Sequence, residues 1–113
     1  MVGSSGRFAA ELVAPDEEPL FFDDIGCLRS FLAARSSVPT AAVAFVVDHH
    51  TGAWIQASRA IYSRNDGIDT PMNSHLLAHE SAASRDADPD AREAVALTVA
   101  EVFANLQLPG GPQ

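Results

Sequence analysis

Soft metal-ligating side chains are scarce in this chain, so the few that it has are easy to follow. Among its 113 residues are one cysteine, two methionines and four histidines. Cys27, Met72 and His75 carry the sulfur and imidazole donors that Cu(I) selects, whereas carboxylate and carbonyl oxygens suit Mg²⁺ or Ca²⁺. These residue types therefore make Cys27 and Met72 candidate ligands of a soft metal ion, with His75 as a third candidate.

Cys27 and Met72 each have a second, purely structural interpretation. Cys27 falls at the start of a predicted helix, where the helix dipole is expected to lower the pKa of the thiol and to favour ligation. It can equally pack against Phe31 one turn later, and the spacing alone favours packing because free cysteines are usually buried. Met72 follows Thr70-Pro71 in a predicted loop, where it either fills a gap under the loop or donates its sulfur. Both alternatives stay open from the residues alone.

The other histidines are predicted to be bystanders. His49 and His50 follow Asp48 in a polar turn, where solvated surface side chains are expected. His79 lies four residues after His75, but the string from His75 to Glu80 is not the zinc-protease HExxH motif, because its glutamate follows the second histidine.

Two further patterns exclude function classes. The run 86–90 resembles the start of a calcium loop, but Ala91 and Leu97 stand where such a loop needs glycine and glutamate, so the run is predicted to cap a helix. No GxSxG motif accompanies the serines, and no nucleophile, base and orienting group come together, so we do not expect an enzyme.

Charge and composition narrow the class further. The chain has 7 basic and 15 acidic residues and a net charge of -8, which is opposite to what a nucleic-acid-binding surface needs. No apolar run approaches the roughly 18 residues of a membrane span. No secretory signal follows Met1 in the chain as given, and a single cysteine forbids an intramolecular disulfide bond. We expect one domain over 1–113, with 1–6 and 108–113 flexible.

The hydrophobic pattern predicts an α+β fold with a small mixed or antiparallel sheet. Two strands, 7–14 and 20–22, form a hairpin, and a helix then begins after Asp23-Asp24 and fades at 36–37. The apolar run 41–47 predicts a central strand that pairs with 54–57. Short strands are expected at 60–62 and 74–79, separated by a loop over 63–71.

A long C-terminal helix is the last predicted element. Asp88 is a suitable N-cap and Pro89 suits the first helical position. The apolar residues that follow have helical spacing over more than three turns. They are Val95, Val99, Val102, Phe103 and Leu106.

Three segments together resemble one known family. Phe22–Leu28 (FDDIGCL), Val47–Ala57 (VDHHTGAWIQA) and Thr70–Met72 (TPM) are similar, in order and spacing, to signatures of NosL, the nitrous-oxide-reductase accessory protein. The resemblance covers roughly Arg7 to Glu80, and FDDIGC and TPM are specific in combination.

The resemblance implies a fold of two related ββαβ-type halves. It also implies an extracytoplasmic, usually lipid-anchored protein that binds Cu(I) and delivers it to a copper enzyme such as nitrous oxide reductase. Cys27 matches the cysteine of FDDIGC, Met72 matches the methionine of the family's TPMG string, and His75 lies close to a histidine that some members place after it. Asn73 replaces the glycine of that string, which is tolerable if the residue adopts a positive φ.

The chain departs from the family at its start. Relatives carry a lipoprotein signal and a Cys-x-x-Cys-x-Met segment before the first strand, and Met1–Phe8 begins where the methionine of that segment would stand. We therefore expect a truncated or divergent member, and the alternative is a metal-free interaction module that keeps the fold and has lost the metal site. The family fold is similar to that of organomercurial lyase. Carbon–mercury cleavage by that enzyme needs a pair of cysteines, so the single cysteine of this chain argues against the same activity.

Overall fold

Two antiparallel sheets form the framework of the computed structural model, which describes residues 6–34 and 41–103. The first sheet has the order β2-β1-β3-β4 and the second the order β6-β5-β7. The strands are β1 Ala10–Val13, β2 Leu20–Phe22, β3 Val43–Val47, β4 Trp54–Gln56, β5 Ile61–Arg64, β6 Leu76–His79 and β7 Val95–Leu97. The structure thus confirms the α+β class and the antiparallel pairing.

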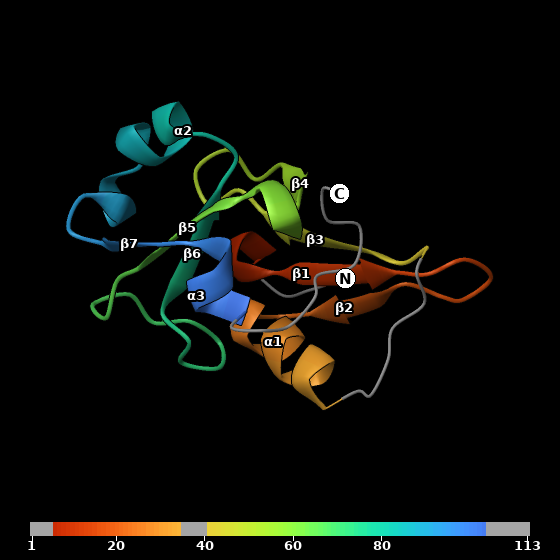
Figure 1. Ribbon diagram of the computed structural model, residues 1–113. Coiled ribbons are helices and arrows are strands. Elements are labelled where there is room, and N and C mark those ends of the chain that lie inside the picture. Colours follow the sequence, from red (N-terminus) through yellow and green to blue (C-terminus); the bar gives the residue numbers. More distant parts are fainter. Residues whose placement is uncertain (1–5, 35–40, 104–113) are drawn as a thin grey trace.

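Short helices connect the strands. They are α1 Ile25–Ala33, α2 Ala82–Ala87 and α3 Val99–Phe103, with single 3-10 turns η1 Gly6–Phe8, η2 Ala57–Arg59 and η3 Pro89–Ala91. The chain order is β1–β2–α1–β3 and then β5–β6–α2–β7, and in each sheet the first strand lies between the second and the third. Both halves therefore have the ββαβ order that the family resemblance implies. Figure 1 shows α1 and α2 on opposite sides of the molecule.

The first half follows the sequence pattern closely. β1 and β2 form the expected hairpin, and β3 lies between β1 and β4, as its apolar run predicts. Asp24 caps α1 by accepting a hydrogen bond from the backbone N–H of Gly26. The apolar stripe Ile25, Leu28 and Leu32 is buried. The predicted end of this helix, at 36–37, lies outside the described residues.

The prediction of a long C-terminal helix is wrong. Asp88 caps only the 3-10 turn η3, and the chain then forms strand β7 and the short helix α3. β7 pairs with β5, whose edge would otherwise be unpaired on that side. Val95 at the start of this segment is β-branched and suits a strand, so pairing overrides the helical spacing. Leu106, at the end of the predicted helix, lies outside the described residues.

A local signal marks the true start of the last helix. The Thr98 N–H donates to a carboxylate oxygen of Glu101, and the Glu101 N–H donates to the Thr98 hydroxyl. This reciprocal pair is a capping box, which the sequence Thr-x-x-Glu encodes. Helix α2, which the sequence pattern did not predict, is capped by Ser81, whose hydroxyl accepts from the Ser84 N–H.

Smaller boundaries also shift. The predicted strand 7–14 is shorter because Arg7 and Phe8 belong to η1. The strand predicted at 60–62 continues through Arg64, and the strand predicted at 74–79 is β6. Of the ends predicted to be flexible, 1–5 and 108–113 lie outside the described residues, and Gly6 begins η1.

Apolar side chains from both sheets, α1 and α3 form one core. Tyr62 of β5 is fully buried, donates its hydroxyl to the Ala57 carbonyl over 2.6 Å, and packs edge-on against Phe103. The His49 N–H, just after β3, donates to the Ala78 carbonyl of β6 and so links the two sheets. In the part of the chain that is described, no helix has the length and apolar character needed to cross a bilayer.

Candidate functional site

A buried carboxylate holds the helix start that carries Cys27 against the loop that carries Met72. Asp24, two residues after β2, has no exposed surface. Its oxygens accept the N–H of Gly26 over 2.7 Å, the N–H of Met72 over 2.9 Å and the Ser74 hydroxyl. One carboxylate therefore joins the first turn of α1 to a loop almost fifty residues later.

The contact between this helix and the loop is close enough to require glycine. A Cβ atom at Gly26 would lie 2.8 Å from the Cβ of Ser74, which is too short for two carbon atoms. The loop can therefore lie this near the helix because residue 26 has no side chain. Of the predicted ligands, Cys27 follows Gly26 directly, and Met72 is itself bonded to Asp24.

The three predicted ligands differ in exposure. The Met72 residue is 63% exposed, whereas Cys27 and His75 are partly buried. The Nδ1 atom of His75 lies 2.8 Å from the Ile68 carbonyl oxygen. A carbonyl can only accept, so Nδ1 carries a proton, and in the neutral ring Nε2 then keeps a free lone pair. This is the tautomer in which a histidine binds a metal through Nε2.

The backbone of this loop is strained at two non-glycine residues. Asn73 has φ 57° and His75 has φ 60°. The condition for tolerating asparagine in place of glycine at 73 is therefore met. Left-handed φ values cost little for asparagine but more for most other side chains.

Electrostatics at Cys27 contradict one expectation. Burial raises the pKa of the Cys27 thiol, and the nearby carboxylates of Asp24 and Asp23 raise it further. The expected lowering of the thiol pKa by the helix dipole is thus wrong, because burial and, after it, the two negative charges that precede the cysteine raise the pKa. At Asp24 burial alone would raise the pKa, but hydrogen bonds from Ser74, Met72, Thr70 and Gly26 outweigh it and hold the pKa below its ordinary value.

A second buried carboxylate, just after β3, also joins two segments that are distant in the sequence. Asp48 is fully buried and accepts the N–H groups of His50, Thr51 and Glu80 and the hydroxyl of Ser84. Burial alone would raise its pKa, but these hydrogen bonds lower it to about 2. Asp48 therefore ties the turn after β3 to the start of α2.

Two of the histidines predicted to be bystanders are buried and paired. The His49 residue is 8% exposed, and its Nε2 lies 2.9 Å from Asp90 Oδ2. His79 has no exposed surface, and its Nε2 lies 2.8 Å from Asp88 Oδ2. The solvated position predicted for His49 is thus wrong, whereas His50 is exposed as expected.

The sequence offers little sign of these two pairs. Their partners lie 41 and 9 residues further along the chain, on the segment that was predicted to be the start of a long helix. Only the folding of η3 against the turn after β3 brings His49 and Asp90 together. Burial alone would raise the pKa of the Asp88 carboxyl. The hydrogen bonds from His79 and from the Asp90 N–H, together with the charges of the His49 and His79 imidazoles, outweigh burial and hold this pKa below its ordinary value.

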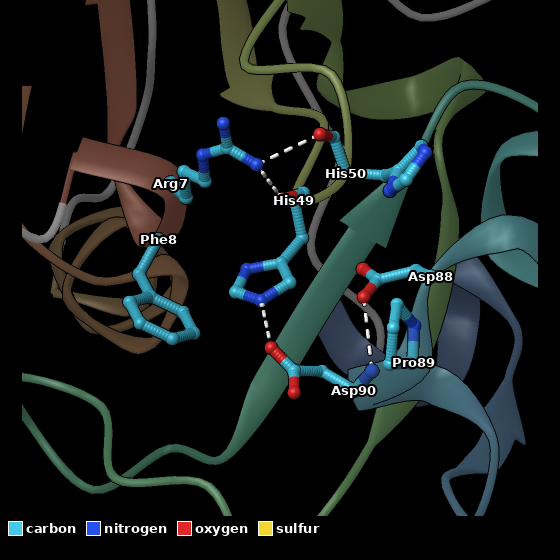
Figure 2. Close-up of a pocket in the computed structure, with 7 residues that line it drawn as sticks. All are labelled: Arg7, Phe8, His49, His50, Asp88, Pro89 and Asp90. Atoms are coloured by element: carbon cyan, nitrogen blue, oxygen red, sulfur yellow. Dashed lines mark hydrogen bonds and ion pairs between the residues drawn. The ribbon is translucent and has the colours of Figure 1, made fainter.

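A pocket of about 500 Å³ opens beside these pairs. It is lined by Arg7, Phe8, His49, His50, Asp88, Pro89 and Asp90 (Figure 2). Arg7 donates from one guanidinium nitrogen to the carbonyl oxygens of His49 and His50, over 2.9 and 2.7 Å. The ring centroids of Phe8 and His49 lie 4.9 Å apart. The pocket therefore joins η1, the turn after β3 and η3.

Two candidate regions are thus available, one with sulfur donors and one with imidazole and carboxylate donors. No protein-family model, no curated protein and no solved structure matches this chain. What the two regions do must therefore follow from their own geometry.

Proposed function

We propose that this protein binds Cu(I) through Cys27 and Met72, with His75 as a third ligand, and passes the ion to a copper enzyme. The observation that carries the proposal is the Asp24 carboxylate, which accepts the N–H groups of both Gly26 and Met72. It holds the two sulfur-bearing segments together through contacts of the fold itself. The sequence resemblance to NosL points to the same residues and to the same role.

The exposure of the donors suits a carrier. Met72 is largely exposed, so a partner can reach its thioether, and Cys27 is partly buried in the first turn of α1. Soft sulfur ligands favour Cu(I) over the hard cations of the cell. A site with few donors and an exposed ligand also allows the ion to leave when a partner supplies competing ligands.

The raised pKa of Cys27 adds a pH dependence. Near neutral pH the thiol is protonated, and a metal must displace this proton before the sulfur can ligate. Cu(I) binding is therefore expected to release one proton and to become tighter as the pH rises toward the pKa of the thiol.

The proposed setting follows the family resemblance. We place the protein outside the cytoplasm, as a non-catalytic accessory factor whose partner is a copper enzyme such as nitrous oxide reductase. The alternative function is a metal-free interaction module. Leu20 and Phe21 on β2 and Trp54 on β4 favour it, since these large apolar residues are exposed on both edge strands of the first sheet.

A competition titration tests the proposal. Reduced protein is titrated with Cu(I) against a chromogenic Cu(I) chelator, and each variant is checked for folding by circular dichroism. We expect 1:1 binding by the wild type and an affinity at least about tenfold weaker for Cys27→Ala and for Met72→Leu, because each loses a sulfur ligand.

Two controls keep the result interpretable. Met72→Leu keeps the size of the side chain and removes only the sulfur. For the third ligand, His75→Ala should weaken Cu(I) binding, whereas its control His50→Ala should not, because His50 is exposed and outside the proposed ligand set. Failure of the wild type to compete for Cu(I), or an unchanged affinity in Cys27→Ala, would overturn the proposal in favour of the metal-free module.

A further inference from the structure

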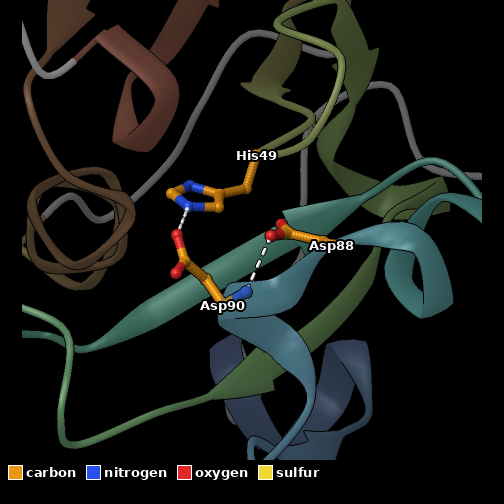
Figure 3. Close-up of side chains that lie close together, drawn as sticks. All are labelled: His49, Asp88 and Asp90. Atoms are coloured by element: carbon orange, nitrogen blue, oxygen red, sulfur yellow. Dashed lines mark hydrogen bonds and ion pairs between the residues drawn. The ribbon is translucent and has the colours of Figure 1, made fainter.

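Three metal-ligating side chains converge at the pocket of Figure 2, and none belongs to the proposed Cu(I) set. One ligand atom each from His49, Asp88 and Asp90 lie within 4.8 Å of one another. Figure 3 shows both carboxylates directed toward the imidazole of His49. One nitrogen and two oxygen donors are a set that suits Zn²⁺ and related first-row divalent cations better than Cu(I).

The separations are compatible with a shared ion. With metal–ligand bonds of 2.0–2.2 Å, donor atoms of a tetrahedral Zn²⁺ site lie roughly 3.3 Å apart. His49 Nε2 and Asp90 Oδ2 are 2.9 Å apart and need to separate only slightly. The three ligand atoms together lie within 4.8 Å of one another, so a shared ion also requires the wider-spaced donors to approach. Asp90 is exposed and can adjust, whereas Asp88 and His49 are held in place by the fold.

Asp88 is oriented by groups behind the cluster. The buried His79 contacts Asp88 Oδ2 over 2.8 Å, and the Asp90 N–H donates to Asp88 Oδ1 over 2.9 Å. Ligating carboxylates in metal sites are held by such outer hydrogen bonds, and loss of these bonds weakens metal binding.

The ring of His49 has an unused buried nitrogen. Nε2 contacts Asp90, and Nδ1 is buried without a hydrogen-bond partner among the described residues. In the neutral ring with Nε2–H donating to Asp90, Nδ1 is an unsatisfied acceptor. When a cation takes the Nε2 lone pair, the proton moves to Nδ1 and the ring remains neutral, and the buried Nδ1–H then requires a water or a small ring movement to find an acceptor.

Charge favours a cation at this position. Asp88 and Asp90 bring two carboxylates to the cluster, and their combined charge exceeds that of the one guanidinium in the pocket lining, Arg7, which donates to the carbonyls of His49 and His50. A divalent ion would neutralise both carboxylates, and the pocket gives it access from solvent with room for a water ligand.

We propose that His49, Asp88 and Asp90 form a second metal site, selective for a divalent cation of the Zn²⁺ type and separate from the Cu(I) site. His49 follows β3 of the first sheet, and the two aspartates lie in η3 or at its cap, just before β7 of the second sheet. The ion therefore links the two halves of the fold, and it stabilises the folded state because only the folded chain assembles the three ligands.

Titration with Zn²⁺ alone tests this site in the Cys27→Ala background, which removes the thiol as a competing ligand. Binding is measured against a chromogenic zinc indicator, and thermal unfolding is followed with and without Zn²⁺. We expect 1:1 binding and a higher melting temperature in Zn²⁺. Asp90→Asn is expected to weaken binding at least about tenfold, the usual range for loss of a group that a metal site depends on.

Asp86→Asn is the matched control, since Asp86 is an exposed carboxylate on the same segment and is not part of the cluster. It should bind Zn²⁺ as the parent does. In ¹⁵N spectra of the histidine rings, Zn²⁺ should shift the Nε2 signal of His49. The proposal is overturned if Asp90→Asn and Asp86→Asn bind Zn²⁺ equally, if no binding occurs at about 100 μM, or if the His49 signals do not move. The Cys27→Ala background makes this outcome independent of the Cu(I) proposal.

Discussion

Asp24 and Asp48 solve the same structural problem at two places in the molecule. Each is a fully buried carboxylate that comes within two residues of the end of a strand in the first sheet. Each accepts the N–H two residues further on, at Gly26 or at His50, and each also holds a segment that belongs to the second half of the chain. The two halves of the fold are thus tied together by two carboxylates.

What each carboxylate positions is different. Asp24 holds a loop with an exposed thioether and two non-glycine residues at positive φ. Asp48 holds the start of α2, and beside it lie the buried pair His79–Asp88 and the pair of buried His49 with exposed Asp90. The first arrangement leaves soft donors accessible at strained backbone, and the second packs nitrogen and oxygen donors into place. The comparison predicts an adaptable region for cargo and a rigid region for structure.

The largest expected effect is on stability. Asp48→Asn should lower the free energy of unfolding by about 2–4 kcal/mol and Asp24→Asn by about 1–3 kcal/mol, because an amide cannot accept from all the donors that each carboxylate satisfies. Urea denaturation measures both values. Asp86→Asn, at an exposed position, is the control and should change little.

These two variants also separate the roles of the two regions. Asp24→Asn should weaken Cu(I) binding, whereas Asp48→Asn, where it still folds, should leave it within about threefold. Equal loss of Cu(I) affinity in both variants would contradict the division into a cargo region and a structural region.

A smaller effect is expected in acid. The Asp48 carboxyl has a pKa of about 2 in the folded protein against an ordinary value of 3.8. A carboxyl that is more acidic when folded contributes stability above its unfolded pKa, and this contribution is lost as the pH falls toward the folded value. The difference corresponds to about 2 kcal/mol lost between roughly pH 5 and pH 2.

Denaturation by urea across this pH range checks the linkage. The wild type should lose stability more steeply than Asp48→Asn, because the variant lacks the group that titrates. Asp24 and Asp88 shift in the same direction, so the variant should retain part of the slope. Parallel pH profiles for the two proteins would show that Asp48 does not carry this dependence.

The sequence predicts the first half of this molecule better than the second. Local sequence patterns predict the cap at Asp24, the apolar stripe on α1 and the central position of β3. These predictions succeed because neighbouring residues in the sequence determine each of these features. Val95 to Phe103 has helical spacing, but pairing with β5 and the capping box at Thr98 divide the segment into a strand and a short helix. Non-local pairing of this kind leaves no periodic signal in the chain.

The same difference applies to the two candidate sites. Cys27 and Met72 were found from residue type and motif, because sulfur is rare in this sequence. The cluster of His49, Asp88 and Asp90 was missed, because histidine and aspartate in polar turns usually face solvent. Only tertiary contacts show that His49 is buried and that the turn at 88–90 lies against it.

The smallest prediction concerns backbone strain, and it compares the two regions directly. Gly52, in the turn that follows Asp48, has φ 80°, and a Cβ atom added there would meet no other atom within 4 Å. Asn73, next to Met72 in the sequence, has φ 57°. Gly52→Ala should destabilise by about 1 kcal/mol, since a side chain disfavours this conformation and no steric clash adds to the cost. Asn73→Gly should change the free energy of unfolding by less than about 0.5 kcal/mol, because asparagine tolerates this conformation and the added freedom of glycine in the unfolded chain offsets the small gain. Urea denaturation measures both values. If Asn73→Gly instead destabilises the protein by more than about 1 kcal/mol, the asparagine side chain contributes to the fold and the strain at 73 is not what distinguishes the two regions.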